Sequence, residues 1–101
     1  MAIEIRPLRE EERETIYALQ SQAFNVPVKR MRQMPPWPAE EARGAVVDGE
    51  VVAMLRTYRF AHFFGGRSVP AVGIGGVSVA AHARGKRVAE TLMIETLREF
   101  R

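Results

Sequence analysis

A basic strand-to-helix junction near the C-terminus holds the residues best suited to bind a negatively charged group. Three cations, Arg84, Lys86 and Arg87, surround Gly85 directly before a stretch with helical apolar spacing. The first turn of a helix leaves N–H groups without internal partners at the positive end of the dipole, and a glycine lets a ligand approach the backbone. The pattern therefore predicts a phosphate or diphosphate site. The alternative is a basic turn that only caps the helix and carries solvated cations.

Few other residues could do chemistry. The chain has no cysteine, which excludes disulfides, thiolate nucleophiles and cysteine-bound metals. Of the two histidines, we expect His62 to be packed or solvated. We expect His82 to lie at the surface beside the anion site, where the alternative is a bond to a phosphate. Glu50 lies in a predicted turn and is a weak candidate base, so the residues alone name no general base.

The N-terminal half must supply the scaffold for this junction. Residues 3–8 alternate apolar with polar and predict a short strand, and residues 9–24 have the spacing and first-turn acids of an amphipathic helix. Prolines interrupt residues 25–38, where at most a short helical turn at 29–33 is expected. We expect Trp37 to pack at an edge of the core, with a groove lining as the alternative.

Turn-forming residues divide the second half of the chain into strands. Asp48-Gly49 between two β-branched runs predicts a hairpin whose second strand ends at Tyr58 or Phe60. A second hairpin is predicted around Gly65-Gly66. Residues 71–80 then follow as a glycine-rich strand, and its three glycines predict a bend, a bulge or a close approach by another group.

A last helix is predicted over residues 86–101, because apolar residues recur there on one helical face. The residues of this face are Val88, Ala89, Leu92, Met93, Thr96, Leu97 and Phe100. The junction thus lies between the glycine-rich strand and this helix.

Length and composition are those of one globular domain. The chain has 101 residues, of which 47% are apolar and 27% charged, which excludes a disordered tail and a fibre. No apolar run approaches the roughly 18 residues of a membrane span, and no signal peptide is present, so we expect a cytoplasmic location without a membrane partner. The net charge of +3 permits an anionic ligand. Scattered basic residues without stacking aromatics do not indicate nucleic acid.

The junction resembles motif A of the GNAT superfamily of acyl-CoA-dependent N-acyltransferases. That motif has Arg or Gln, two residues, a glycine, one residue and then Gly or Ala, directly after a strand that ends apolar-x-apolar. Arg84 and Ala89 match the first and last positions, and Val77-Ser78-Val79 matches the strand end. Arg87 stands where the motif has its central glycine, so its side chain would either crowd the phosphates or supply an extra cation.

The resemblance implies an α+β fold: the front half of the GNAT fold, with a mostly antiparallel sheet of about four strands plus a hairpin, and two main helices. It also implies transfer of an acetyl group from acetyl-CoA directly to an amine acceptor. The Val77 N–H would polarise the thioester carbonyl, and the strand around Val79 would pair with the pantetheine arm. The cofactor-binding residues implied in this way are Val77, Val79, Arg84, Gly85, Lys86, Arg87, Val88 and Ala89.

Within the superfamily, the hairpin at residues 65–70 before Gly76 is most similar to the enhanced-intracellular-survival branch, whose members acetylate aminoglycosides and lysines. Some family members carry a glutamate base four residues before the polarising amide, where this chain has Gly73. Family members continue beyond the motif A helix. The resemblance therefore implies that residues 1–101 form a single truncated domain that lacks part of the cofactor cleft.

Two further expectations follow from this partial fold. The strand edge at residues 74–80 lacks its usual neighbour, which favours a homo-oligomer through that edge or through the last helix. The function alternative to an acetyltransferase is a non-catalytic module of the same fold that binds CoA or another anion, or that assembles with itself.

Overall fold

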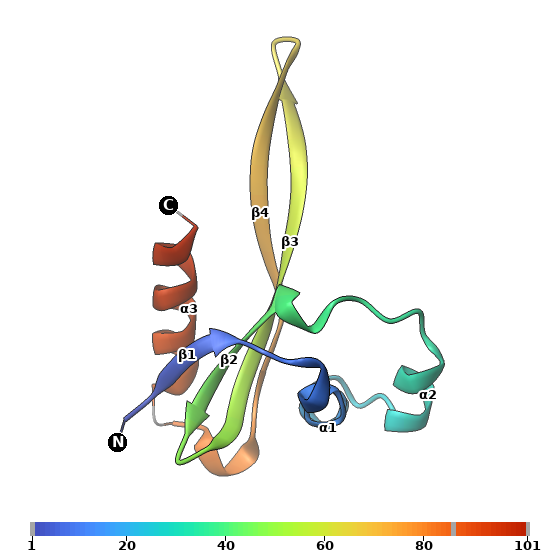
Figure 1. Ribbon diagram of the computed structural model, residues 1–101, viewed down its shortest axis with the longest axis vertical. Helices are drawn as coiled ribbons and strands as arrows, with labels where there is room; N and C mark the ends of the chain where they lie inside the picture. Colours follow the sequence, from blue (N-terminus) through green and yellow to red (C-terminus); the bar gives the residue numbers. More distant parts are fainter. Residues whose placement is uncertain (1, 86, 101) are drawn as a thin grey trace.

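The computed structural model describes residues 2–85 and 87–100, with the side chains of all of these except 59–64, 67 and 69–71. Its elements run in the order β1 (Glu4–Pro7), the 3-10 turn η1 (Glu10–Glu12), α1 (Arg13–Phe24), α2 (Val28–Gln33), the 3-10 turn η2 (Ala39–Glu41), β2 (Ala42–Val47), β3 (Glu50–Phe64), β4 (Arg67–Val79), the 3-10 turn η3 (Ala81–Ala83) and α3 (Val88–Glu99). Figure 1 shows that the sheet stands at the centre, between α3 and the α1–α2 segment.

The strands form one antiparallel sheet in the order β1-β2-β3-β4. Asp48 and Gly49 join β2 to β3, with φ values of 51° and 79°. These are the left-handed values that a tight hairpin turn requires, so the predicted hairpin is confirmed. β4 pairs only with β3 and lies at one edge of the sheet.

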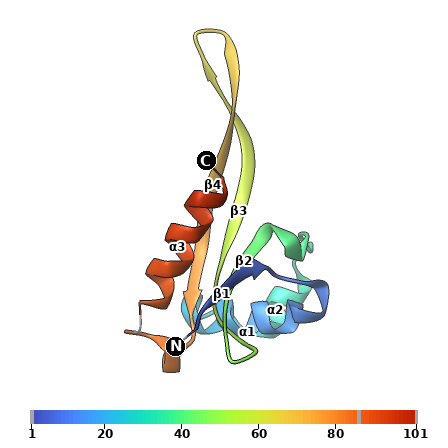
Figure 2. The ribbon, with the colours of Figure 1, turned by 60° about the vertical axis from the view of Figure 1, so that its left-hand side comes forward.

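β3 and β4 are longer than the sequence patterns predict. The patterns predict a strand end at Tyr58 or Phe60, but β3 continues to Phe64, and residues 67–79 form one strand rather than two. β3 contains no glycine or proline before Gly65-Gly66 and is rich in branched and aromatic residues, so the two predicted hairpins share this strand. In Figures 1 and 2 the distal end of this hairpin projects beyond the helices.

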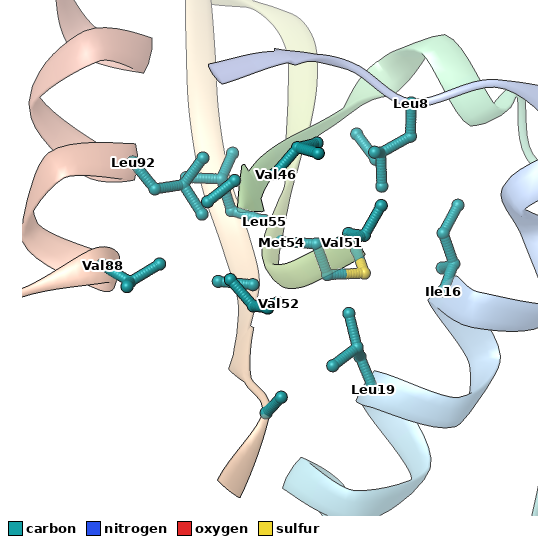
Figure 3. Close-up of a cluster of buried hydrophobic side chains, with 14 of the residues drawn as sticks. Leu8, Ile16, Leu19, Val46, Val51, Val52, Met54, Leu55, Val88 and Leu92 are labelled. Carbon is teal, nitrogen blue, oxygen red and sulfur yellow. The ribbon is translucent and has the colours of Figure 1, made fainter. Parts of the chain in front are cut away.

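The two long helices cover opposite faces of the sheet. Val88 and Leu92 of α3 lie on one side of the strands, and Ile16 and Leu19 of α1 lie on the other (Figure 3). All four side chains are at most 6% exposed. Residues 51–55 of β3 between them are buried at every position, as an apolar run covered on both faces should be.

The segment between α1 and β2 closes over one side of this core. Asn25 ends α1 in the left-handed conformation with φ of 54°, and α2 forms where a short helical turn is predicted. Trp37 packs against the core, which confirms its predicted role, and the Arg56 guanidinium stacks on its ring at 4.3 Å.

The apolar face of α3 is narrower than predicted. Val88, Leu92 and Thr96, which follow one another at intervals of four residues, are buried against the sheet. Leu97 lies on an adjoining face and is 55% exposed, so its predicted burial is wrong. Within the described part of the chain, no helix is both long and apolar enough to cross a bilayer.

A charged pair ties β1 to the start of α1. Arg6 donates two hydrogen bonds of 2.8 Å to the two carboxylate oxygens of Glu12, and the Arg9 N–H donates to the same carboxylate at 2.9 Å. The hydrogen bonds from Arg6, and then that from the Arg9 N–H, hold the pKa of Glu12 below its ordinary value of 4.5. The ionised form of Glu12 therefore stabilises the folded state.

We expect this pair to make stability depend on acid pH. Because the folded pKa of Glu12 is depressed, its contribution is fully present above about pH 4.5 and is lost as pH falls through the folded pKa. Glu12→Gln should lower the free energy of unfolding by about 1–2 kcal/mol at pH 7 and by less at pH 3. Urea unfolding at a series of pH values measures how the difference in stability between wild type and Glu12→Gln shrinks towards pH 3. Arg6→Met, which removes the partner of Glu12, should show the same pH-dependent loss. Wild-type and Glu12→Gln profiles that stay parallel would contradict the assignment.

Candidate functional site

β4 carries a bulge next to its C-terminal end. Met54 lies opposite Ser78 and Arg56 opposite Gly75, so Leu55 of β3 faces two residues of β4, Gly76 and Val77. Gly76 has φ of 60°, the left-handed value found at the first position of bulges of this kind. Of the three alternatives predicted from the glycines, a bend, a bulge or a close approach, the bulge is therefore present, and its residue Val77 is 37% exposed.

Ser78 holds this bulge from the inside, a role that the sequence analysis missed. Its side chain is 1% exposed, and its Oγ donates a hydrogen bond of 3.2 Å to the Gly76 carbonyl. Gly75 is closely approached as well, because a Cβ there would come within 3.1 Å of the Tyr58 ring. The serine in the apolar-x-apolar strand end was the available signal, since a hydroxyl buried in a strand needs a local partner.

Beyond β4 the chain turns back through a short 3-10 segment. The Ala80 N–H donates to the Val52 carbonyl at 2.7 Å, and the Arg84 N–H donates to the Ala81 carbonyl at 3.4 Å. Gly85 follows with φ of 81°, and a Cβ built on it would meet no atom within 4 Å. The backbone at Gly85 is thus open to a ligand, whereas the predicted cofactor residue Lys86 lies outside the described residues.

α3 begins at Val88, with Arg87 as its N-cap residue, and no side chain of the described residues caps it. The Arg87 carbonyl accepts bonds of 3.0 Å from both the N–H and the Oγ1 of Thr91. The N–H groups of the first helical turn, beginning at Val88 and Ala89, have no acceptors within the helix. The structure therefore places a positive helix end directly beside the open backbone of Gly85.

Arg87 itself adopts a glycine-like conformation, with φ of 57° and ψ of 20°. This explains the central glycine of motif A, since L-residues pay about 1–2 kcal/mol in the left-handed region. Arg84 and Arg87 are both exposed at the loop surface. The departure from the motif thus adds a cation at this loop and also strains its backbone.

Replacing Arg87 by glycine should stabilise the chain. Relief of the left-handed strain is partly offset by the greater freedom of glycine in the unfolded state, so we expect a net gain of about 0.5–1 kcal/mol. A scanning calorimeter should record this as a rise of a few degrees in Tm. Arg87→Ala is the matched control, because it removes the cation and retains the strain. An equal gain in both variants would show that charge, and not backbone conformation, is responsible.

Two of the three candidate bases, His82 and Glu50, lie together beside this junction. His82 is exposed, and its Nε2 lies 3.4 Å from the Glu50 carboxylate, so the structure supports the predicted surface position. The side chain of His62 lies outside the described residues. No group of three metal-binding side chains occurs in residues 2–85 and 87–100.

A cavity of about 370 Å³ opens on the other face of the sheet, between α1, α2 and β3. We call it the α1–α2 pocket. Gln20 and Arg56 line it. The same Gln20 side chain comes within 3.6 Å of a Cβ built on Gly76, and Arg56 lies opposite Gly75 in the sheet register. The pocket therefore adjoins the β4 bulge, a relation between distant segments that sequence reasoning did not predict.

The family model described as "Acetyltransferase (GNAT) domain" matches residues 4–101, nearly the whole chain. The chain belongs to the GNAT acetyltransferase family. The expected membership of the GNAT superfamily and the expected fold class are thus confirmed, and the bulge and the start of α3 lie within the matched residues. No curated protein matches this sequence.

Solved structures show the same fold over almost the whole chain. A GCN5-related N-acetyltransferase from Anabaena variabilis has a TM-score of 0.82 at 22% identity, covering 97% of this chain and 26% of its own. Eis1 from Mycobacterium abscessus has a TM-score of 0.75 at 20% identity, and the match covers 97% of this chain and 24% of Eis1. A GNAT family acetyltransferase from Brucella melitensis, solved in complex with acetyl-CoA, has a TM-score of 0.68 at 20% identity, covering 97% and 68%. The chain thus spans about a quarter of the length of the first two.

Proposed function

We propose that this chain is the acetyl-CoA-binding part of an N-acetyltransferase that transfers the acetyl group directly to an amine. The observation that supports this most strongly is the continuity of the β4 bulge, the open Gly85 backbone and the uncapped start of α3. At the β4 bulge, an edge strand offers a backbone donor, and at the start of α3 the free N–H groups of a helix N-terminus can bind an anion. The Brucella relative, which was solved with acetyl-CoA, supports the same cofactor.

The residues present fit such a ligand. The loop and helix start would hold the pyrophosphate, through Arg84, Gly85, Lys86, Arg87, Val88 and Ala89. The N–H groups would supply hydrogen bonds and the arginines charge, while the absence of a Cβ at Gly85 leaves room for a phosphate. The edge of β4 at Val77 and Val79 would pair with the extended pantetheine arm.

The proposed reaction is an acyl transfer. Acetyl-CoA supplies an activated carbonyl: the amine nitrogen forms a C–N bond to it, the C–S bond breaks, the nitrogen loses a proton and the sulfur gains one. The Val77 N–H would donate to the carbonyl oxygen, where negative charge develops. Gly73 supplies no base, so the proton leaves through water or through a group elsewhere in the protein.

CoA binding tests this proposal by thermal shift. Saturating CoA should raise the Tm by several degrees through mass action, and Arg84→Glu should remove most of that rise. Arg30→Glu is the matched control, since it makes the same charge change on α2, across the sheet from α3. A shift of equal size in wild type and Arg84→Glu would contradict the proposed site.

The alternative, a non-catalytic module that binds CoA, is supported by Gly73, which supplies no base four residues before Val77. Release of free thiol from acetyl-CoA with a panel of amines separates the two functions. We expect weak turnover or none from residues 1–101 as a single partial domain. Binding without thiol release would favour the module, and sustained thiol release would favour the enzyme.

We also propose that the chain self-associates through the edge of β4 when CoA does not occupy that edge. This strand lies at the edge of the sheet with Val77 partly exposed, and exposed edge strands favour pairing with another strand. Sedimentation equilibrium at high micromolar concentration should give a mass above 11.4 kDa. A monomer mass across the concentration range would contradict this.

The narrower assignment to the enhanced-intracellular-survival branch also remains a proposal. It is supported by the likeness to Eis1, which is one of several GNAT structures that match. We also propose a cytoplasmic location, and cell fractionation tests it by showing whether the protein is recovered with the cytoplasm.

A further inference from the structure

We infer that the α1–α2 pocket binds the acceptor, and that this acceptor is a primary amine on an apolar, aromatic-sized body with no second positive charge. The inference rests on the proposed function for its reaction, and it adds the class of acceptor. Three properties of the pocket carry it: the chemistry of its wall, its contact with the β4 bulge, and the charges around it.

The wall of the pocket is largely apolar. The lining side chains that form this wall are Tyr17, Phe24, Val26, Met31, Met34 and Trp37. Phe24 and Met34 are each 50% exposed and line the same pocket, so exposed apolar surface is gathered here in one place. An aromatic body of a small amine would cover them, and a volume of about 370 Å³ accommodates a ligand of that size.

The pocket reaches the place where the acetyl group is proposed to lie. Gln20 lines the pocket and also sits 3.6 Å from a Cβ built on Gly76, the residue before the proposed Val77 donor. Arg56 forms another part of the wall and lies opposite Gly75. An amine bound with its apolar body between α1 and α2 can therefore direct its nitrogen towards the bulge.

The charges around the pocket disfavour a polycation. No carboxylate is among the described residues that line it. Two acids on the elements around the pocket are already paired: Glu41 with Arg56 at 3.2 Å, and Glu14 with Arg32. The exposed surface of α2 adds further positive charge at Lys29 and Arg30. A ligand with several ammonium groups would find no unpaired carboxylate here and would meet repulsion.

Trp37 provides a direct measurement of binding, because it is the only tryptophan of the chain and lines the pocket. Titration of the 101-residue chain with 2-phenylethylamine, in the presence of CoA, should change the tryptophan emission in a saturable way. Spermine, titrated over the same concentrations, should bind with at most a tenth of the affinity of 2-phenylethylamine. Equal or tighter binding of spermine would overturn the inference.

Matched variants locate the binding. Phe24→Ser should weaken 2-phenylethylamine binding about tenfold, whereas Leu97→Ser, which removes a similarly exposed apolar side chain from α3, should leave it unchanged. Met34→Ser serves in place of Phe24→Ser if that variant fails to fold. Equal effects of the pocket and control variants would overturn the inference. If CoA raises the Tm but no amine binds, the inference is overturned and the proposed function stands. If the amine binds but CoA does not raise the Tm, the proposed function is overturned and the amine site stands.

Discussion

Gly76→Val should lower the free energy of unfolding by about 2–4 kcal/mol, one of the largest effects of any single substitution in this chain. Gly76 has φ of 60°, a left-handed value that a β-branched residue adopts only at high cost. The cost is conformational, because a Cβ at this position would meet only Gln20, at 3.6 Å, which is ordinary contact. Urea unfolding measures the loss directly.

Two matched substitutions separate backbone conformation from side-chain volume. Gly76→Asn should cost less than about 1 kcal/mol, since asparagine tolerates the left-handed region, and Gly76→Ala should lie between the other two. If the bulge also presents the Val77 N–H to the thioester, the CoA-induced rise in Tm should persist in Gly76→Asn and shrink in Gly76→Val. Equal losses for asparagine and valine would refute the conformational explanation.

The second large effect is expected where α3 is fastened to the sheet. Arg43 of β2 is 7% exposed, and it donates bonds of 2.7 and 2.8 Å to the two carboxylate oxygens of Glu99. It also donates to the Glu40 carbonyl and stacks on the Phe100 ring at 5.3 Å. This contact fixes the C-terminal end of the helix whose N-terminal end forms the proposed anion site.

Removing the acid should cost more than removing the base. Glu99→Met leaves a buried guanidinium without its carboxylate, for an expected loss of about 2–3 kcal/mol. Arg43→Met leaves a carboxylate that is 43% exposed and can turn to water, so about 1 kcal/mol is expected. The double variant should lose less than Glu99→Met alone. Chemical denaturation of the three variants tests this order, and the reverse order of the two single variants would contradict it.

Much of the local structure could be predicted because short-range rules determine it. Asp48-Gly49 readily adopts the left-handed backbone values that a tight hairpin turn requires. Residues 84–89 directly follow a predicted strand and have the spacing of a helix start. The glycines around Gly76 likewise predicted a bend, a bulge or a close approach by another group, because glycine weakens a regular strand and is common at these irregular positions. Each of these predictions depends on neighbours within a few residues.

Other features could not be predicted because they depend on packing between distant segments. Arg43 and Glu99 are 56 residues apart, so no local pattern pairs them. The exposure of Leu97 follows from which face of α3 packs against the sheet, the face of Val88, Leu92 and Thr96, and the helical period alone does not specify that choice. The α1–α2 pocket likewise exists only because α1 lies across β4, where Gln20 meets Gly76.

The amino-acid sequence by itself determined the turns, the periods of the helices and strands, and the basic glycine-containing loop, since these follow from backbone sterics and from side-chain spacing along one segment. The tertiary structure decided that Ser78 bonds the carbonyl of Gly76 in the bulge, that Arg87 occupies a glycine-like conformation, and which apolar side chains are left to line a pocket. Those outcomes depend on how two faces of one sheet are covered, and that is a property of the packed chain as a whole.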